Sequence, residues 1–179
     1  HWGQKYEPVS IEFYETLYNT KIDEYGCIRH PKYSFIGASP DGINVDKYNS
    51  RYGRMLEIKN VVSRKINGNP KFEYWIQMQV QMETCNLNEC DFLETKFVEY
   101  KSEEDFLNDG SFTWTTEKKL KGFMLLFSNN GSYYYEYAPL YIQEHEYKKW
   151  EEQMLEKNAH MEWINNIYWK LETYSNILV

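Results

Sequence analysis

The chain has 179 residues, a formal net charge of −7 and an aromatic content of 18%. This length suffices for one domain with a sizeable core, and so many aromatic residues argue against a disordered chain. No apolar run approaches the roughly 20 residues of a membrane-spanning helix, and the negative net charge does not by itself favour nucleic-acid binding. Because the chain begins at His1 without a Met or a signal peptide, we expect a piece of a longer protein.

Three cysteines, Cys27, Cys85 and Cys90, have neither CxxC spacing nor a histidine at zinc-ligand distance. We interpret them as buried, reduced thiols. Such thiols are typical of an intracellular protein.

The first third of the chain predicts one helix and three strands. Apolar residues recur at helical spacing over residues 5–20, which predicts an amphipathic helix entered through Pro8 at its first turn. Residues 33–38 and 42–46 predict a strand pair around the turn Ser39–Pro40–Asp41–Gly42. A third strand is expected over residues 55–62.

Residues 73–85 are locally ambiguous, because polar and apolar residues alternate from Gln77 to Met82 as they do in a strand. Gln, Met and Glu are good helix formers, however, and Trp75, Met78 and Met82 fall on one helical stripe. We therefore predict a helix. A strand over residues 90–100 and an acidic polar loop to about residue 111 are expected to follow.

The last third of the chain predicts a hairpin and two helices. The hairpin joins residues 121–127 to 132–138 through a turn at Asn129–Asn130–Gly131. The helices are expected at about 142–158 and 160–175, within a C-terminal helical region over 140–179. The whole pattern predicts a single α+β domain over residues 1–179, with a mixed central sheet flanked by helices.

Two carboxylates and a lysine form the most informative pattern in the chain. Asp41 stands in a tight Pro–Asp–Gly turn, and Glu57 and Lys59 lie on one face of the third predicted strand, because strand side chains alternate. A pair of acids can hold Mg²⁺ or Mn²⁺, and an adjacent ammonium can steer a water to a phosphate. The pattern therefore predicts a metal-dependent phosphodiesterase, and first of all a nuclease.

The charge around this pattern is opposite to the charge of the whole chain. Residues 51–71 contain one acid, Glu57, and six basic residues: Arg51, Arg54, Lys59, Arg64, Lys65 and Lys71. We expect this basic cluster to surround the candidate site, where phosphates would arrive. The alternative is a solvated loop with incidental lysines.

Two further polar residues strengthen the hypothesis. Glu7 lies at the start of the first predicted helix, where a carboxylate is otherwise a favourable partner of the helix dipole. Gln77 shares a helix face with Gln81 and offers an amide donor to a phosphate or to an attacking water. A plain polar helix position is the alternative for Gln77.

These pieces resemble the successive motifs of the phage lambda exonuclease family, the YqaJ-type viral recombinase branch of the PD-(D/E)xK nucleases. The motifs are Trp2–Gly3 with Tyr6–Glu7, Ser39–Pro40–Asp41–Gly42, Leu56–Glu57–Ile58–Lys59, and Tyr74 with Gln77 and Gln79. The resemblance covers about residues 1–100 and keeps the family's order. It implies a restriction-endonuclease-like fold and a Mg²⁺- or Mn²⁺-dependent deoxyribonuclease that acts as an exonuclease in viral recombination or replication.

The resemblance also implies a role for each matching residue. Asp41 and Glu57 would be the principal ligands of one or two metal ions, with the Ile58 carbonyl completing the site and Glu7 binding a second metal or its waters. Lys59 would orient or help to deprotonate the attacking water, and Gln77 would contact that water or the scissile phosphate. A homo-oligomer and an annealing-protein partner are further family expectations, and DNA is the expected substrate.

Contacts to the DNA backbone are expected from Arg64 and Lys65, which follow the catalytic strand. Two alternatives to the exonuclease stay open at this point. The same site could serve an endonuclease that is selective for structure or sequence. A domain with the same fold could also bind nucleic acid or assemble with partners without hydrolysing anything.

Overall fold

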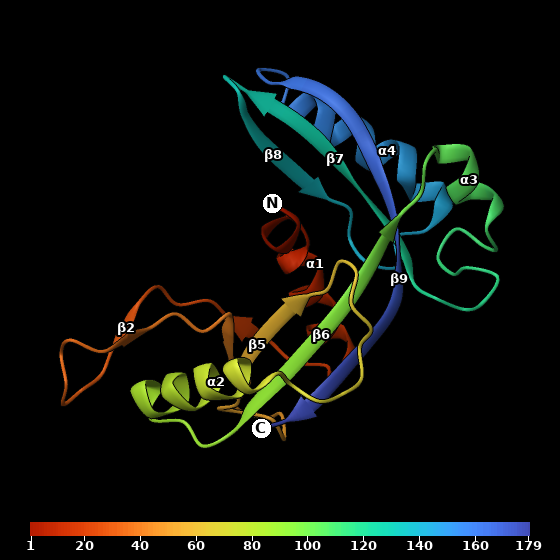
Figure 1. Ribbon diagram of the computed structural model, residues 1–179. Coiled ribbons are helices and arrows are strands. Elements are labelled where there is room, and N and C mark those ends of the chain that lie inside the picture. Colours follow the sequence, from red (N-terminus) through yellow and green to blue (C-terminus); the bar gives the residue numbers. More distant parts are fainter. The chain divides into compact units, whose positions relative to one another are not determined.

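The computed structural model describes all residues, 1–179, which divide into two compact units. Unit 1 comprises His1–Lys96 and Tyr174–Val179, and unit 2 comprises Phe97–Thr173. Two long strands, β6 (Cys90–Glu99) and β9 (Glu162–Leu178), contribute residues to both units (Figure 1). A single nuclease domain over the whole chain stays a prediction.

Unit 1 contains a mixed sheet, as the sequence predicts. Its strands β1 (Ile22–Asp23), β4 (Gly42–Asn44), β5 (Met55–Asn60) and β6 lie side by side in this order. β1 and β5 are antiparallel to β4, whereas β5 and β6 are parallel and are connected through helix α2 (Phe72–Cys85). Val179, the residue after β9, extends this sheet beside β6 through two backbone hydrogen bonds with Cys90.

Side-chain alternation along β5 places a helix on each face of this sheet. Leu56 and Ile58 point to one face, where they are buried with Ile11 and Tyr14 of helix α1 (Trp2–Leu17). Residues of the other face pack against α2, in a cluster of Met55, Met78, Met82, Cys90 and Phe92. The predicted placement of Glu57 and Lys59 opposite Leu56 and Ile58 is thereby confirmed, and both polar residues lie on the α2 face.

Helix α1 begins earlier than predicted. Pro8 lies inside the helix and not in its first turn, so the prediction of an entry through Pro8 is wrong. The reason is an N-cap at His1, whose ring Nδ1 accepts a hydrogen bond from the amide of Gln4 at 3.4 Å. The added turn brings the Trp2–Gly3 motif into the helix.

The strand pair expected around Asp41 is wrong in its pairing. Strand β3 (Gly37–Ala38) pairs with β2 (Ile28–Arg29) in a separate two-stranded sheet, and β4 pairs with β1 and β5. The chain leaves one sheet at Ala38 and enters the other at Gly42, so Asp41 stands in a connection between two sheets. Strand β5 is confirmed, although it ends at Asn60 and not at residue 62.

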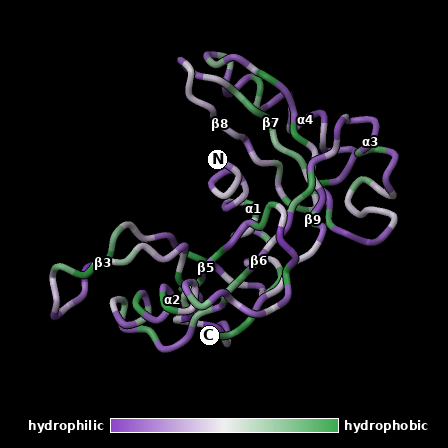
Figure 2. Tube along the Cα trace, in the orientation of Figure 1, coloured by the Kyte–Doolittle hydropathy of each residue, from purple (hydrophilic) through white to green (hydrophobic).

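Unit 2 is built on β7 (Lys121–Asn129) and β8 (Ser132–Tyr137), which form the predicted hairpin, and on the unit 2 part of β9, which pairs with β7. Figure 2 shows the hydrophobic stretch of β7 in green. Helix α4 (Glu144–Lys157) confirms the first of the two predicted C-terminal helices. Its Tyr147 packs into a cluster with Phe106, Phe123 and Tyr168.

Two predictions for this part of the chain are wrong. The acidic loop contains helix α3 (Glu103–Asn108), because the Ser102 hydroxyl caps it by accepting a hydrogen bond from the amide of Asp105. The helix expected at 160–175 is strand β9. Here pairing with β7, from Lys121 opposite Lys170 to Ser128 opposite Glu162, outweighs a local spacing that also fits a helix.

The cysteines differ in their surroundings, and none forms a disulfide. Cys90 is buried, Cys85 is partly buried and Cys27, which directly precedes β2, is exposed, so the expectation of three buried thiols is wrong. None of the four helices combines the length and apolar composition of a bilayer-spanning helix.

Candidate active site

Asp41 is fixed to strand β5 by its own carboxylate. Its Oδ2 accepts a hydrogen bond from the backbone amide of Ile58 at 2.7 Å. Strand β4 begins at Gly42 opposite Leu56, so at Ile58 the Asp41 side chain takes the place of a neighbouring strand. The carbonyl of a strand residue points to the same side as its amide, so the Ile58 carbonyl faces the side on which Asp41 lies.

Glu57, Lys59 and Gln77 form a triangle of polar contacts on the α2 face of the sheet. Lys59 Nζ lies 3.2 Å from Glu57 Oε1 and 3.4 Å from Gln77 Oε1. The Gln77 amide nitrogen donates to Glu57 Oε1 at 3.3 Å. Strand β5 supplies the acid and the lysine two residues apart, and α2 supplies the amide across the β5–α2 connection.

Glu57 is 2% exposed, and one of its carboxylate oxygens, Oε2, is buried without a hydrogen-bond partner. Gln81 is also buried, and its amide contributes a hydrogen bond to the Glu57 carboxylate. A buried carboxylate oxygen without a partner is costly to the fold unless a cation or a proton compensates it. Glu57 is therefore the position in the site that most needs a positive ligand.

Three carboxyl groups influence one another here. Burial, followed by the charge of Asp41, raises the pKa of Glu57 to about 7. Burial and then Asp41 likewise raise the pKa of Glu7 to about 7, and Glu7 and Asp41 share a hydrogen bond. Burial also raises the pKa of Asp41, against the lowering effect of the Ile58 amide. Crowded carboxylates of this kind are typical of metal and catalytic sites.

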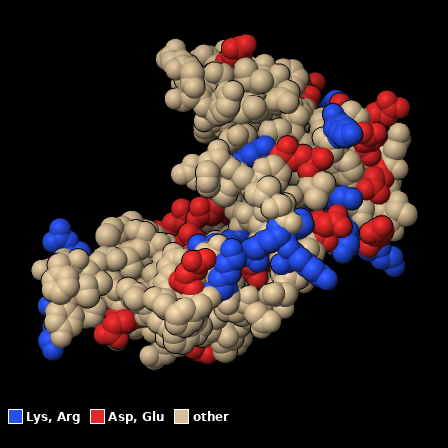
Figure 3. All heavy atoms as spheres, in the orientation of Figure 1, with Lys and Arg blue, Asp and Glu red and all other residues tan.

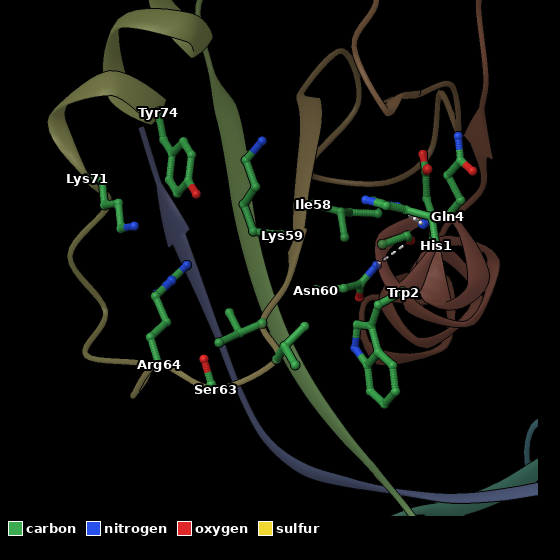
Figure 4. A pocket seen from close by; sticks show the side chains of 14 residues that line it. His1, Trp2, Gln4, Ile58, Lys59, Asn60, Ser63, Arg64, Lys71 and Tyr74 are labelled. Atoms are coloured by element: carbon green, nitrogen blue, oxygen red, sulfur yellow. Dashed lines mark hydrogen bonds between the residues drawn. The ribbon is translucent and has the colours of Figure 1, made fainter.

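A cavity of about 600 Å³ opens beside these groups. One wall comes from α1, with His1, Trp2 and Gln4, and the opposite wall carries Lys59 of β5 and Lys71 and Tyr74 at the start of α2 (Figure 4). Glu7 and Ile58 also line it, so it reaches the predicted site. The Lys59 and Lys71 ammonium groups lie 4.6 Å and 5.7 Å from the Tyr74 ring centroid.

Asn60 also belongs to this site, although no sequence pattern singles it out. Its Nδ2 donates to the Gly3 carbonyl of α1 at 2.9 Å. Its Oδ1 accepts from the hydroxyls of Ser10 at 2.8 Å and of Thr95 at 2.6 Å. The side-chain amide of Asn60, the residue after Lys59, thus connects α1, β5 and β6 through hydrogen bonds. Only the position of Asn60 next to the Glu–x–Lys pattern could have indicated this role.

The basic residues of 51–71 separate into two groups. Lys59, Arg64 and Lys71 line the cavity, and Figure 3 shows Lys and Arg side chains gathering over the segment that joins β5 to α2. Arg51 and Arg54 do not belong to this group, contrary to expectation. They bind the buried carboxylate of Asp91 at 2.7 Å and 3.2 Å, which is a structural role.

Arg64 and Lys65, the two expected backbone contacts, lie differently. The Arg64 guanidinium is held by an ion pair with the buried Glu94 while it lines the cavity. Lys65 is exposed and does not line the cavity. The structure therefore brings Arg64 to the site and leaves Lys65 outside it.

Nowhere in the chain do three or more His, Cys, Asp or Glu side chains converge in a metal-holding geometry. The donors at the site nevertheless suit a hard cation. Asp41 and Glu57 supply carboxylate oxygens, one of them buried and unpartnered, and the Ile58 carbonyl lies on the side of Asp41. Oxygen donors without sulfur or imidazole favour Mg²⁺ or Mn²⁺ over zinc.

Comparison with known proteins locates this site in a matched region. Residues 1–88, which lie within unit 1, match the model of the YqaJ-like viral recombinase domain. Over 123 residues the chain is 40% identical to an uncharacterized protein of Acanthamoeba polyphaga mimivirus; this covers 62% of the chain and 22% of that protein.

Two solved structures are also similar. An alkaline exonuclease from Laribacter hongkongensis, LHK-Exo, is 30% identical with a TM-score of 0.44, covering 57% of this chain and 51% of that one. LHK-Exo in complex with dAMP is 32% identical with a TM-score of 0.42, covering 51% of this chain and 47% of the other. The chain thus spans about half the length of the exonuclease and about a fifth of the mimivirus protein.

Proposed function

We propose, on the premise that residues 1–88 belong to the YqaJ-like viral recombinase domain family, that the chain is a metal-dependent DNA exonuclease. The single observation that carries the proposal is the cluster of Asp41 with Glu57 and Lys59 of β5, where Glu57 keeps one buried carboxylate oxygen without a partner. Lys59 of this cluster lines a cavity that has further basic residues in its wall. Acids beside a cationic cavity suit the hydrolysis of a phosphodiester.

Asp41, Glu57 and the Ile58 carbonyl would hold one or two divalent cations, Mg²⁺ or Mn²⁺, with Glu7 at the second position. When bound, such a cation activates water at neutral pH and neutralises charge that develops on the phosphate. The raised pKa values of Glu7 and Glu57 fit this assignment, because a cation would replace the protons that the crowded carboxyl groups otherwise retain.

The remaining residues would position the substrate. Lys59 Nζ, held between Glu57 and Gln77, is placed to orient a water and to hold a proton near it. Gln77 contacts Lys59 through its carbonyl oxygen, and its amide nitrogen, which donates to Glu57, has a second N–H for the water or the phosphate. Arg64 and Lys71 offer positive charge to the DNA backbone from the cavity wall.

A digestion assay tests this proposal. Purified chain is incubated with Mg²⁺ and either an end-labelled linear duplex or a covalently closed circle. We expect the linear DNA to be degraded and the circle to stay intact. The Glu57→Ala and Lys59→Ala variants should each lose about 10²–10⁴-fold in rate, since each removes a group that acts on the attacking water or its cation.

The matched control is Glu73→Ala, which removes an exposed acid in the first turn of α2 that does not line the cavity. This variant should digest DNA like the parent. Full activity of Glu57→Ala would overturn the assignment of the site. Cleavage of the circle would show an endonuclease and not an exonuclease. Binding of DNA without any hydrolysis would show a DNA-binding domain that is not a nuclease.

A further inference from the structure

Two aromatic side chains in the first turn of α2 point to solvent instead of the core. Phe72 is 74% exposed and Trp75 is 45% exposed. Their rings lie almost parallel, with an interplanar angle of 8° and centroids 6.1 Å apart. Large apolar rings that stay exposed side by side are a common sign of a binding surface.

The same helical turn also forms part of the cavity wall. Lys71 and Tyr74 line the cavity, and Phe72 and Trp75 follow each of them by one residue. Successive residues of a helix are rotated by about 100°, so the aromatic pair lies next to the cationic face of this turn. Figure 4 shows Lys71, Tyr74 and Arg64 on the same side of the cavity as Lys59.

We propose that Phe72 and Trp75 form a platform on which bases of an unpaired DNA strand stack, while the phosphates of that strand lie along Lys59, Arg64 and Lys71. The inference rests on the proposed function, because it assigns the place of a DNA strand at that site. Bases in a duplex are stacked on one another, so only an unpaired strand can offer their faces to protein rings.

The chemistry of the surface favours this ligand over a protein partner. A nucleotide combines a flat apolar face with a negative charge at a short distance, and the first turn of α2 offers flat rings beside ammonium groups. Stacking on an aromatic ring is tolerant of sequence because every base has a flat face. The platform would therefore hold a strand irrespective of its sequence.

The test separates bases from phosphates. Binding of a fluorescent single-stranded oligonucleotide and of an abasic strand of equal length is measured by anisotropy in EDTA, which prevents metal-dependent hydrolysis. We expect the parent chain to bind the normal strand about tenfold more tightly than the abasic strand, as one or two stacked bases would give. In the Phe72→Ala/Trp75→Ala variant this difference should fall to about twofold or less.

Two further variants sharpen the result. Phe72→Leu/Trp75→Leu keeps apolar bulk without flat rings and should behave like the alanine variant. Tyr48→Ala removes a fully exposed aromatic ring that does not line the cavity and should keep the tenfold difference. Thermal unfolding of all variants checks that they are folded.

The proposal is overturned if the parent binds both strands equally, or if the alanine variant keeps the full difference; the rings would then serve another partner, such as a protein. Failure of the nuclease proposal has a separate signature. If the chain binds the normal strand more tightly through Phe72 and Trp75 but digests no DNA, the stacking platform is supported and the nuclease proposal is refuted.

Discussion

At the scale of single residues, the negative charge of Glu57 works against the fold. Its pKa is about 7 in the folded chain and 4.5 in a model peptide, so the folded state binds the proton more tightly than the unfolded state. The free energy of unfolding therefore falls as the pH rises from about 4.5 to about 7 and stays low above that range. Glu7, whose pKa is also about 7, adds to the same trend.

Replacing Glu57 by Gln should consequently stabilise the metal-free chain at pH 8. We expect the unfolding midpoint to rise by about 2–6 °C, because the variant removes a buried charge and keeps the shape of the side chain. At pH 4, where the carboxyl group is protonated, the parent and the variant should differ little. An unchanged or lowered midpoint at pH 8, measured by calorimetry in EDTA, would contradict this reading of Glu57.

The site also depends on Gly42, because there is no room for a side chain at this position. A Cβ at this position would lie 2.3 Å from Cγ2 of the buried Ile22 and 3.4 Å from the Asp23 carbonyl oxygen. The Gly42→Ala variant should lose about 1–3 kcal/mol of stability, since the strand that follows Asp41 must move.

The DNA digestion rate of Gly42→Ala should fall together with its stability, because Asp41 would leave its position against the Ile58 amide. Gly53→Ala is not a suitable control, because its φ of 83° would itself strain an alanine. Gly26→Ala is a better one, since nothing lies within 4 Å of the added atom. Equal behaviour of Gly42→Ala and Gly26→Ala would contradict the role of Gly42.

The charged residues of the site are easier to predict from the sequence than the neutral ones. Asp41, Glu57 and Lys59 could be selected because their types and spacing suggest a chemistry. Asn60 and Gln81 are amides that act through contacts with chain segments far away in the sequence, such as Gly3 and Thr95. Local patterns carry no signal for such contacts.

Among the secondary-structure elements, the site depends on the hydrogen bonds by which Asn60 connects α1, β5 and β6. Replacing Asn60 by Leu removes three hydrogen bonds and leaves the hydroxyls of Ser10 and Thr95 and the Gly3 carbonyl without this partner. We expect a loss of about 2–4 kcal/mol in the free energy of unfolding, measured by urea denaturation.

An Asn69→Leu variant controls for the change in residue type, because Asn69 is exposed in the loop before α2. It should change stability by less than about 0.5 kcal/mol. If Asn60→Leu were as stable as Asn69→Leu, the hydrogen bonds of Asn60 would not stabilise the packing of α1 on the sheet.

The elements that the sequence predicted well are those with a clear period and a local signal. Strand β5 and the β7–β8 hairpin belong to this class, the latter because Asn–Gly marks its turn. The period of helix α2 was ambiguous, and its helix-forming residues decided the prediction correctly. Strand β9 was missed because Trp163, Ile167 and Leu171 also fit a helical stripe. Its pairing with β7 is decided by residues about 40 positions away, which a local window does not include.

At the scale of the whole molecule, an acidic chain carries a local basic surface. The net charge is −7, yet Lys59, Arg64 and Lys71 line one cavity. If these three side chains contact phosphates of an unpaired strand, the logarithm of the binding constant should fall with the logarithm of the salt concentration with a slope of about −2.1.

Lys71→Ala should reduce the magnitude of this slope by about 0.7, the value for one lost phosphate contact of a single strand. Lys47→Ala removes an equal charge from an exposed turn that does not line the cavity, so its slope should match the parent's. Anisotropy titrations between about 50 and 200 mM salt give all three slopes. Equal changes in both variants would mean that the cavity has no special part in binding.

A crystal soaked in Mn²⁺ would show whether Asp41 and Glu57 hold the cation for hydrolysis. Anomalous scattering identifies manganese without reference to the protein density. We expect an anomalous peak between the carboxylates of Asp41 and Glu57, within reach of the Ile58 carbonyl, that disappears in crystals of Glu57→Gln. A peak that persists in Glu57→Gln, or manganese bound only elsewhere on the chain, would contradict the assignment of these two ligands.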